Sequence, residues 1–396
     1  MTQTRHDWTV IASVSTVHFV SHIHILALAP LFPLLQKEFG CGYTALGLIM
    51  IGYNLVTALL QTPMGRITDR FGGRALLVLA QIGAALAFLA ASMAQSLTGL
   101  AICVALAGIA NAVYHPADMA LLSRHVSHTR RAEAFATHSL AGIAGFAAAP
   151  LLIGAWGLIA GWRAGLMLTA TLSCLGLIAL LVLNTLPLGK HIPNDTGFSR
   201  RVPAWKIPVF RRQFGLFAAF GAISAASQGF MIPALLAYSG MKVGAATTFL
   251  SAYLLAITLG VALGGMTARR LLPARSLMFG MGGSALCWAL ASLTLLPQPL
   301  LFALICVAGL ANGLALPSRD TLLAGLAEGP DQAAIFGFVT AGLGVGQVIA
   351  PLVAGPLVDQ GLGVALFPLL AALSLACLLG REAAPSSETA GHSLPR

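Results

Sequence analysis

Charged residues are scarce in this sequence, and their scarcity excludes a soluble protein. Only 9% of the 396 residues are Asp, Glu, Lys or Arg, whereas 58% are hydrophobic and the mean hydropathy is +0.87. Soluble globular domains do not have this composition. Because a charged side chain costs roughly 2.5–3.5 kcal/mol at the centre of a bilayer, charge-free apolar runs of about 20 residues indicate membrane-spanning helices. The sequence therefore predicts an integral membrane protein.

Cysteine is also sparse, and its spacing excludes a disulfide framework. The six cysteines stand singly, without the spacing of a metal or redox motif. The segment HFVSHIH at 18–24 lacks the glutamate of the metalloprotease pattern HExxH. No nucleophile and base pair, phosphate-binding loop or nucleotide motif stands out elsewhere. These absences predict a protein that is not an enzyme, has no cofactor and is not driven by ATP.

Twelve apolar runs are present instead, and they predict an all-α membrane protein. The runs are about twice as long as a barrel strand and do not alternate polar with apolar residues, which favours helices. A basic, proline-containing segment separates the first six runs from the last six. The predicted organisation is an N-terminal six-helix bundle at 1–186, a cytoplasmic linker at 187–213, a C-terminal six-helix bundle at 214–381 and a disordered cytoplasmic tail at 382–396.

The two halves are related by an internal repeat. AGIANAVYHPADMALL at 107–122 matches AGLANGLALPSRDTLL at 308–323, an interval of 201 residues. The same interval relates Ala149 and Pro150 to Ala350 and Pro351. The copies differ where one has His115 and the other has Leu316. The repeat predicts two pseudo-symmetric bundles, and the unmatched histidine predicts a role for one half alone.

The distribution of the basic residues orients the chain. Nineteen of the 22 Lys and Arg residues, Arg124 and Arg319 among them, fall in loops and termini on one side of the predicted membrane. By the positive-inside rule both termini are cytoplasmic. The net charge of +10 is thus a topological signal and does not indicate nucleic-acid binding.

One loop motif resembles a known family. The sequence GRITDRFGGR at 65–74 resembles the cytoplasmic loop signature of the major facilitator superfamily, and GWR at 161–163 is another common feature of that family. The resemblance implies two six-helix bundles around a central cavity, in a bacterial inner membrane. It also implies a cytoplasmic gate in which Asp69 pairs with a basic residue of the fourth span only in the outward-facing state. The predicted gate residues are Gly65, Asp69, Arg70, Gly72, Arg74 and Arg124.

Three further segments indicate export. SHIHILALAPLFPLLQKEF at 21–39 and VYHP at 113–116 resemble the fosmidomycin-resistance group of exporters. His22 departs from that group, where an acidic residue is expected. The segment GFAAAPLLIG at 145–154 resembles the antiporter signature of drug exporters, in which a Gly-Pro pair forms a pliable bend. Its key residues here are Gly145, Ala149 and Pro150.

Histidine is the main ionisable residue inside the predicted spans. Five of the ten histidines lie in spans of the first half, and none lies in a span of the second. An ionisable residue inside a membrane is a candidate functional residue. His18 and His22 are about 40° apart around a helix, so both can face one cavity. His24 points to the opposite side, which predicts packing or an interhelical hydrogen bond.

Two further helices supply partners for this pair. His115 lies beside Pro116 in the fourth span, and Asp118 shares the face of His115, so its carboxylate can orient the imidazole. His138 lies inside the fifth span. Imidazole titrates near pH 6.5, within the working range of a proton gradient. The predicted proton-coupling site consists of His18, His22, His115, Asp118 and His138.

The predicted substrate cavity is neutral. Its candidate residues lack Lys and Arg, which argues against phosphorylated substrates. Weakly charged organic molecules suit it better. The candidates are Tyr53, Asn54, Ser224, Ser227, Gln228, Asn312 and Gln347.

The sequence thus predicts a monomeric, proton-coupled exporter of small, drug-like organic compounds, working by antiport in a lipid bilayer. The alternatives are an importer of an organic anion or metal chelate, and a transport-inactive membrane sensor. The histidines have alternatives too, because each can bridge helices and three imidazoles suit zinc, nickel or copper. No acidic or thiolate ligand clearly joins them in the sequence, so no metal is predicted.

Overall fold

The computed structural model describes residues 3–182, 204–267, 272–293, 296–326 and 332–380, and within these ranges all regular secondary structure is helical. In this part of the chain, ten helical segments are long and apolar enough to cross a membrane, and a shorter apolar helix covers Gly363–Leu379. The structure agrees with the prediction of a multi-pass, all-helical membrane protein.

The first half opens with a broken helix. Pro30 and Pro33 lie in the first turns of two successive short helices, where proline is tolerated but cannot continue the preceding hydrogen-bond ladder. The helices of this half are α1 Gln3–Leu26, α2 Phe32–Phe39, α3 Tyr43–Phe71, α4 Gly73–Ser92, α5 Leu97–His125, α6 Arg131–Ala149, α7 Ala155–Ala160 and α8 Trp162–Val182.

The second half begins at Pro208, inside the segment that the sequence assigns to the linker. Proline suits this position because the first amide of a helix has no intrahelical partner. The predicted linker residues 187–203 and tail 382–396 lie outside the described residues. The helices of this half are α9 Pro208–Ser239, α10 Val243–Thr267, α11 Pro273–Ala291, α12 Gln298–Leu326, α13 Gln332–Asp359 and α14 Leu366–Ala376.

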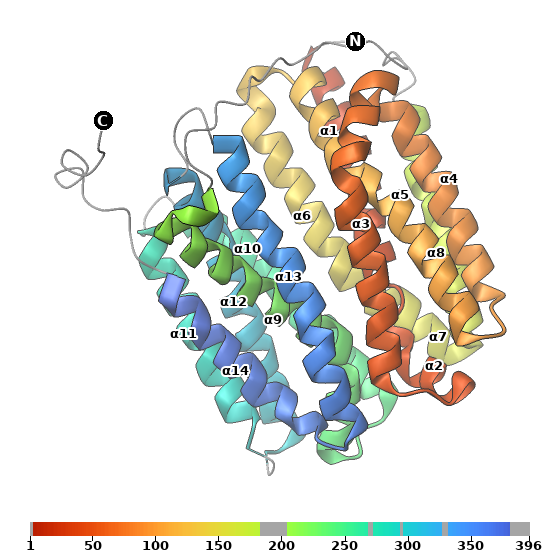
Figure 1. The fold of residues 1–396 in the computed structure, drawn as a ribbon, viewed down its shortest axis with the longest axis vertical. Coiled ribbons are helices and arrows are strands. Elements are labelled where there is room, and N and C mark those ends of the chain that lie inside the picture. The colour runs from red at the N-terminus through yellow and green to blue at the C-terminus, as the bar shows by residue number, and fades with distance from the viewer. Residues whose placement is uncertain (1–2, 183–203, 268–271, 294–295, 327–331, 381–396) are drawn as a thin grey trace.

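Equivalent helices pack in equivalent ways in the two halves (Figure 1). In the first half α1 packs on α6, and α3 and α4 pack on α5; in the second half α9 packs on α13, and α10 and α11 pack on α12. The halves meet chiefly where α3 packs on α13 and α6 packs on α10. This arrangement agrees with the two-fold pattern that the repeat predicts.

Glycines of the repeat lie where α5 contacts α3 and where α12 contacts α10. A Cβ atom on Gly108 of α5 would lie 2.7 Å from the carbonyl oxygen of Tyr53 on α3. At the equivalent place in the second half, a Cβ atom on Gly309 of α12 would lie 2.5 Å from the carbonyl oxygen of Tyr253 on α10. Small residues allow such close approach of helices within a membrane.

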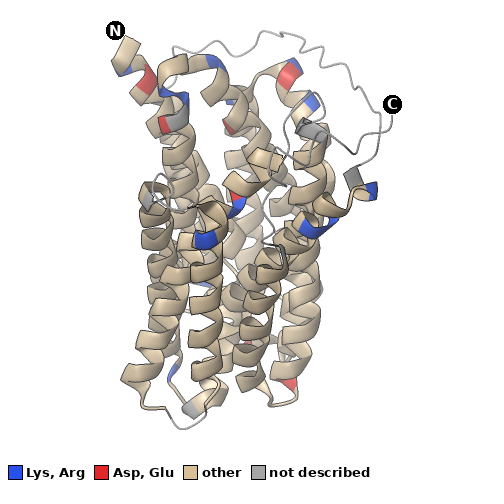
Figure 2. Cartoon of the chain, turned by 90° about the vertical axis from the view of Figure 1, so that its left-hand side faces the viewer, with Lys and Arg blue, Asp and Glu red and all other residues tan. Residues whose placement is uncertain are grey.

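The two ends of the molecule differ in charge (Figure 2). Most Lys and Arg residues lie toward the end that carries the N-terminus. We call this the basic end; the first turn of α1 and the last turns of α3 and α5 lie there. We call the other the Asp359 end, since α13 ends at Asp359 there.

The halves are packed together at the Asp359 end. In Figure 1 α3 and α13 lie close at their lower ends and separate toward their upper ends. The ring centroids of Phe32 and Phe230 are 6.1 Å apart, and Cβ atoms on Gly154 and Gly355 would come within 3.0 Å and 2.7 Å of Thr247 and Thr44 in the opposite half. The described conformation is therefore closed at the Asp359 end.

Candidate functional site

Four of the predicted histidines lie together between α1, α5 and α6. His18 is central: its ring centroid lies 4.4 Å from that of His22, 5.0 Å from that of His115 and 3.7 Å from that of His138. The three helices therefore bring the predicted proton-coupling residues into one place.

Asp118 joins two of these imidazoles. Its Oδ2 atom lies 3.1 Å from Nε2 of His138, with hydrogen-bond geometry, and 3.3 Å from Nδ1 of His18. Oδ1 has no hydrogen-bond partner, and the side chain is fully buried. A buried carboxylate is unfavourable unless a neighbouring positive charge or a proton neutralises it. His18 and His138 are the groups within reach that can neutralise Asp118. We call His18, His22, His115, Asp118 and His138 the histidine–aspartate cluster.

The cluster has an accessible side and a buried side. His18, His138 and Asp118 are 3%, 1% and 0% exposed, whereas His22 and His115 are partly exposed. The rings of His22 and His115 lie 6.2 Å apart. Both ring nitrogens of His22 are buried without a hydrogen-bond partner. The partly exposed His115 therefore marks the accessible side of the cluster, and His18 contacts both His115 and the buried carboxyl group.

A glycine face on α6 makes room for the cluster. His138, Gly142 and Gly145 recur at helical spacing and so share one face of α6. A Cβ atom on Gly142 would lie 2.7 Å from Nε2 of His18, and one on Gly145 would overlap the carbonyl oxygen of Phe19. The missing side chains let α6 lie directly against α1.

His24 lies outside the cluster, as its position on α1 predicts. Its Nε2 atom is 3.0 Å from Oγ of Ser173 on α8, and both side chains are buried. The sequence therefore predicted its role as an interhelical hydrogen-bonding residue correctly.

The cluster also has the composition of a metal site. One ligand atom each from His18, Asp118 and His138 lie within 4.8 Å of one another. Asp118 thus does supply an acidic group beside the imidazoles, contrary to one sequence argument against a metal. One nitrogen each of His18 and His138 lies 3.3 Å and 3.1 Å from the same oxygen of Asp118. These are distances of contact with a shared carboxylate, whereas a bound ion would need ligands at about 2.0–2.2 Å.

The predicted cavity residues divide into two groups. Ser224 and Gln228 are partly exposed on α9, where Nε2 of Gln228 donates to Oγ of Ser224 at 2.8 Å. Asn54 and Gln347 are also partly exposed. The other group is buried and packs inside the bundles: Tyr53, Ser227 and Asn312.

Two of the buried residues have partners inside their own half. Nδ2 of Asn312 lies 3.4 Å from the hydroxyl oxygen of Tyr253, and the hydroxyl group of Ser227 donates to the carbonyl oxygen of Ile223 at 2.7 Å. Asn312 thus joins α12 to α10, whereas the Ser227 bond lies within α9. The partly exposed group remains available to a substrate.

The loop motif forms the predicted pair of Asp69 and Arg124. Nη2 of Arg124 lies 2.7 Å from Oδ1 of Asp69. The pair is intact in this conformation, in which α3 and α13 separate toward the basic end, and both partners belong to the first half. Its release on inward opening stays a prediction. The pair ties the end of α3 to the end of α5.

The other motif residues shape the turn between α3 and α4. Gly72 has a φ of 89°, which only glycine adopts readily. Nε of Arg74 donates to the carbonyl oxygen of Leu180 on α8 at 3.2 Å, and the guanidinium group of Arg70 lies 5.3 Å from the ring centroid of Phe71. A Cβ atom on Gly65 would lie 3.7 Å from Pro116. The motif thus fastens the turn to α5 and α8.

We expect Asp69→Asn to change the free energy of unfolding by no more than about 1 kcal/mol, because exposed ion pairs contribute little. The side chains of Arg124 and Asp69 are 34% and 52% exposed. Thermal unfolding in detergent checks this. A loss of several kcal/mol would show that the pair is a structural element.

The antiporter-like segment departs from α-helical geometry at the place where the resemblance predicts a bend. The helix changes at Ala149 and Pro150 into a π-helical turn, Pro150–Gly154, which separates α6 from α7. Such turns are frequent at functional sites. A Cβ atom on Gly154 would lie 3.0 Å from both Pro30 and Thr247. The π-helical turn therefore lies where the first half touches α10.

Arg319 is a residue that the sequence interpretation misplaced. The sequence places it among the loop charges, but α12 continues to Leu326 and the arginine is only 8% exposed. Its guanidinium carbon lies 4.4 Å and 4.9 Å from the ring centroids of Phe217 and Phe220, and Nη2 lies 2.8 Å from Asp320. The repeat interval equates Arg319 with Asp118, a signal that was available in the sequence. The second half therefore has a buried cation where the first has a buried acid.

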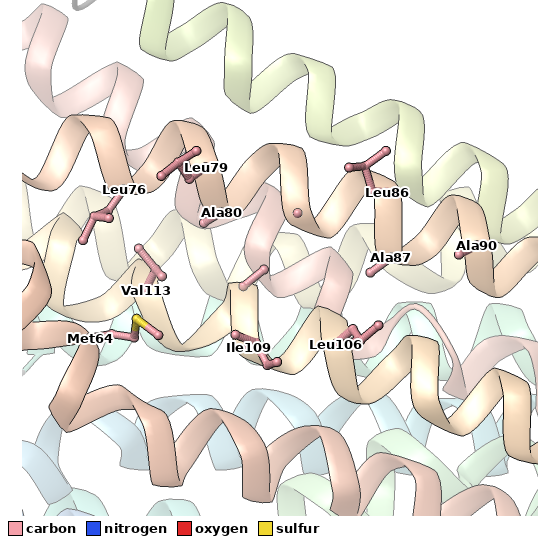
Figure 3. A pocket seen from close by; sticks show the side chains of 12 residues that line it. Met64, Leu76, Leu79, Ala80, Leu86, Ala87, Ala90, Leu106, Ile109 and Val113 are labelled. Carbon is pink, nitrogen blue, oxygen red and sulfur yellow. The ribbon is translucent and has the colours of Figure 1, made fainter.

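The pocket in Figure 3 is not a polar site. It is a cavity of about 520 Å³ between α3, α4 and α5, lined by apolar residues alone. Leu79 and Leu86 on its wall are 63% and 62% exposed. Without a polar group it cannot orient a substrate, and it suits apolar surroundings such as lipid.

The fold and the site define a helical, multi-pass membrane transporter rather than an enzyme. The family model of the Major Facilitator Superfamily matches residues 14–287 and 214–393. The chain therefore belongs to the Major Facilitator Superfamily.

Individual relatives are distant. The chain is 24% identical to the fosmidomycin resistance protein of Escherichia coli over 151 residues, which cover 38% of this chain and 37% of that protein. The chain thus spans little more than a third of that relative. It is 27% identical to the probable nitrate/nitrite transporter NarK2 of Mycobacterium tuberculosis over 356 residues, which cover 85% of this chain and 87% of that protein.

Solved structures share the fold. An inward-facing, unoccupied bacterial homologue of the human lysosomal transporter Spinster has a TM-score of 0.74 at 16% identity and covers 95% of this chain and 97% of its own. A POT family transporter in complex with 5-aminolevulinic acid has a TM-score of 0.76 at 15% identity and covers 95% of both chains. At these identities the likeness concerns the fold.

Proposed function

We propose that this chain exports small organic compounds in exchange for protons. The observation that carries the proposal is the buried Asp118 between the imidazoles of His18 and His138. A buried acid without a fixed cation has a strong preference for net neutrality, so it takes up or releases a proton as its surroundings change. Transporters use such groups as proton relays.

In this mechanism His115 receives the proton on the partly exposed side of the cluster, and His22 lies beside His18 within it. The proton passes to His18 and is shared with Asp118 and His138. Rocking of the halves then exposes the cluster to the other side of the membrane, where the proton leaves. The substrate binds beside the partly exposed residues Ser224, Gln228 and Gln347.

We further propose twelve membrane spans, with α11 and the helix at Gly363–Leu379 completing the ten longer segments. The protein works as a monomer in a bacterial inner membrane, with both termini in the cytoplasm. The basic end is then the cytoplasmic end, as the positive-inside rule requires. The described conformation, closed at the Asp359 end, is inward-facing in this orientation.

Export has a specific competitor. The fosmidomycin resistance relative favours export of an organic compound. The longer match to a probable nitrate/nitrite transporter favours movement of a small anion instead. Protonated His22 and His115 offer positive charge to an anion. In the anion mechanism the substrate binds these imidazoles directly. In the export mechanism the organic substrate competes with protons only indirectly.

Proton flux in inverted membrane vesicles tests the proposal. A pH-sensitive dye reports the acid lumen, and a panel of amphiphilic organic compounds and small anions, including nitrate, is added. Alkalinisation of the lumen by an organic compound supports antiport. Alkalinisation by nitrate alone favours the anion mechanism. A complete absence of substrate-induced flux would contradict both.

The variants His22→Ala and His115→Ala test the two imidazoles that contact His18 from α1 and α5. We expect transport that persists in either variant to lose its dependence on pH, because one imidazole of the cluster is missing. Transport rates from pH 5.5 to 8 provide the measurement. His24→Ala is the matched control, since His24 lies on α1 but outside the cluster. Wild-type kinetics in both cluster variants would end this mechanism.

A further inference from the structure

Asp359 joins the two halves of the protein by capping a helix in the opposite half. The carboxylate terminates α13 and accepts hydrogen bonds from the first amides of α3. The distances are 2.6 Å from the Tyr43 amide nitrogen, 2.9 Å from the Thr44 amide nitrogen and 2.6 Å from the Thr44 hydroxyl oxygen. The first amides of a helix have no intrahelical acceptor, so such a carboxylate satisfies them.

The neighbouring backbone admits this contact only because side chains are missing. A Cβ atom on Gly42, which precedes α3, would lie 2.6 Å from Oδ2 of Asp359. A Cβ atom on Gly355, one turn before Asp359, would lie 2.7 Å from Cα of Thr44. Gly42 has no side chain with which to cap α3 itself. The start of α3 is thus open to a carboxylate from the other half.

The position of Asp359 is favourable only while α3 is near. An acidic residue at a helix C-terminus faces the negative end of its own macrodipole, whereas it is stabilised at the N-terminus of another helix. When the halves separate at this end, the Asp359 carboxylate loses its hydrogen-bond donors, and the first amides of α3 lose their acceptor. The contact therefore depends on conformation.

The equivalent contact on the other side of the two-fold arrangement is apolar. The repeat interval of 201 residues equates Asp359 with Leu158. A Cβ atom on Gly244, at the start of α10, would lie 3.8 Å from Cδ1 of Leu158. One side of the closed end is thus held by packing, and the other by charge-assisted hydrogen bonds.

The other acidic residues with identified partners act within one half. Asp69 pairs with Arg124, Glu38 with Arg163, Asp118 with His138 and Asp320 with Arg319. Among the acidic residues that the structure describes, Asp359 alone has hydrogen-bond partners in the opposite half. Its hydrogen bonds therefore depend on the position of one half relative to the other.

We propose that Asp359 is a conformational lock: it stabilises the state closed at the Asp359 end, and its release from the N-terminus of α3 is a step of every transport cycle. The proposal requires alternating access of the two halves. It does not depend on the direction of transport, the substrate or the proton site.

Distances between spin labels test the lock directly. One pair is placed at the Asp359 end, on the exposed residues Thr98 and Gln298, and a second pair at the basic end, on Thr129 and Ala324. Both are introduced as cysteines into a chain without its six native cysteines. For Asp359→Ala we expect the closed-to-open ratio at the Asp359 end to fall about tenfold, since hydrogen bonds to a charged group are lost. The distances at the basic end should shorten in parallel.

Gly42→Ala tests the same contact from the other side. Its methyl group displaces the carboxylate, so it should shift the distances in the same direction. The double variant Gly42→Ala, Asp359→Ala should shift them no further than Asp359→Ala alone. Fully additive shifts would contradict a shared contact.

Glu38→Ala is the matched control. Nη1 of Arg163 lies 2.7 Å from Oε1 of Glu38, and both residues lie near the Asp359 end but in the first half. This variant should leave both distance distributions unchanged. Gel filtration and thermal unfolding show that each variant is folded. Unchanged distances in folded Asp359→Ala, or an equal shift in Glu38→Ala, would overturn the proposal. Because the labels need neither substrate nor a proton gradient, the result is independent of the proposed export activity.

Discussion

Asp118→Asn should abolish proton movement while substrate exchange across the membrane continues. The amide keeps the size of the carboxyl group and one oxygen acceptor for His138, but it does not take up or release a proton. The charged partner of both His18 and His138 is lost with the carboxylate. Because the amide cannot carry the proton, substrate-induced proton flux should fall to background.

The measurement separates coupling from binding. Substrate-induced proton flux in vesicles reports coupling, and exchange of labelled for unlabelled substrate without a gradient reports binding and rocking. Asp320→Asn is the control. Asp320 lies on α12 next to Arg319, the residue that the repeat equates with Asp118, but its side chain is 59% exposed. Proton flux at the wild-type rate in Asp118→Asn would disprove the role of the cluster.

Gly346→Ala and Gly145→Ala should each destabilise the protein, by about 1–3 kcal/mol, because they overfill a tight contact. The repeat interval equates these two glycines. A Cβ atom on Gly346 of α13 would overlap the carbonyl oxygen of Ala218 on α9, just as one on Gly145 would overlap that of Phe19 on α1. Both new methyl groups would meet backbone, which cannot move aside as a flexible side chain can.

Thermal unfolding in detergent measures this effect, with a thiol-reactive dye reporting exposure of the buried Cys287 and Cys377. Gly344→Ala is the control on the same helix, because its Cβ atom would meet nothing within 4 Å. That variant should be as stable as the wild type or slightly more stable, since alanine favours helix over glycine. Equal stability of Gly344→Ala and Gly346→Ala would show that the close approach is not needed.

Gly145→Ala should also impair coupling, because its contact lies beside the cluster. The Cβ atom would come within 2.9 Å of Cβ of His22 as well as meeting Phe19. Separation of α6 from α1 moves His138 away from His18. Gly346→Ala has no such cluster nearby, so a coupling defect is expected in Gly145→Ala beyond the common loss of stability.

The sequence was sufficient where local pattern and chemistry decide the outcome. Charge-free runs predicted the membrane helices, because the bilayer excludes charged side chains. Helical spacing separated His24 from His18 and His22, and the structure finds His24 bonded to Ser173 instead of joining the cluster. The loop motif predicted the partner of Asp69 correctly.

The sequence was insufficient where residues of different helices decide the outcome. Arg319 looks like a loop charge because it lies near the end of an apolar run, and only the rings of α9 reveal that it is buried. The loop motif does not show that both partners of the Asp69 pair belong to the first half, which the structure shows. No local pattern distinguishes Asp359 from any other polar residue after a helix.

The sequence by itself determined a two-half helical membrane protein whose embedded histidines all lie in the first half, because bilayer exclusion of charge and the 201-residue repeat act along the chain. Only the tertiary structure decided which imidazoles lie beside Asp118 and which end is closed. The reason is distance: Asp118 and His138 are 20 residues apart, and Asp359 and Tyr43 are 316 residues apart. Their contacts exist only because glycine faces allow the helices to pack backbone against backbone.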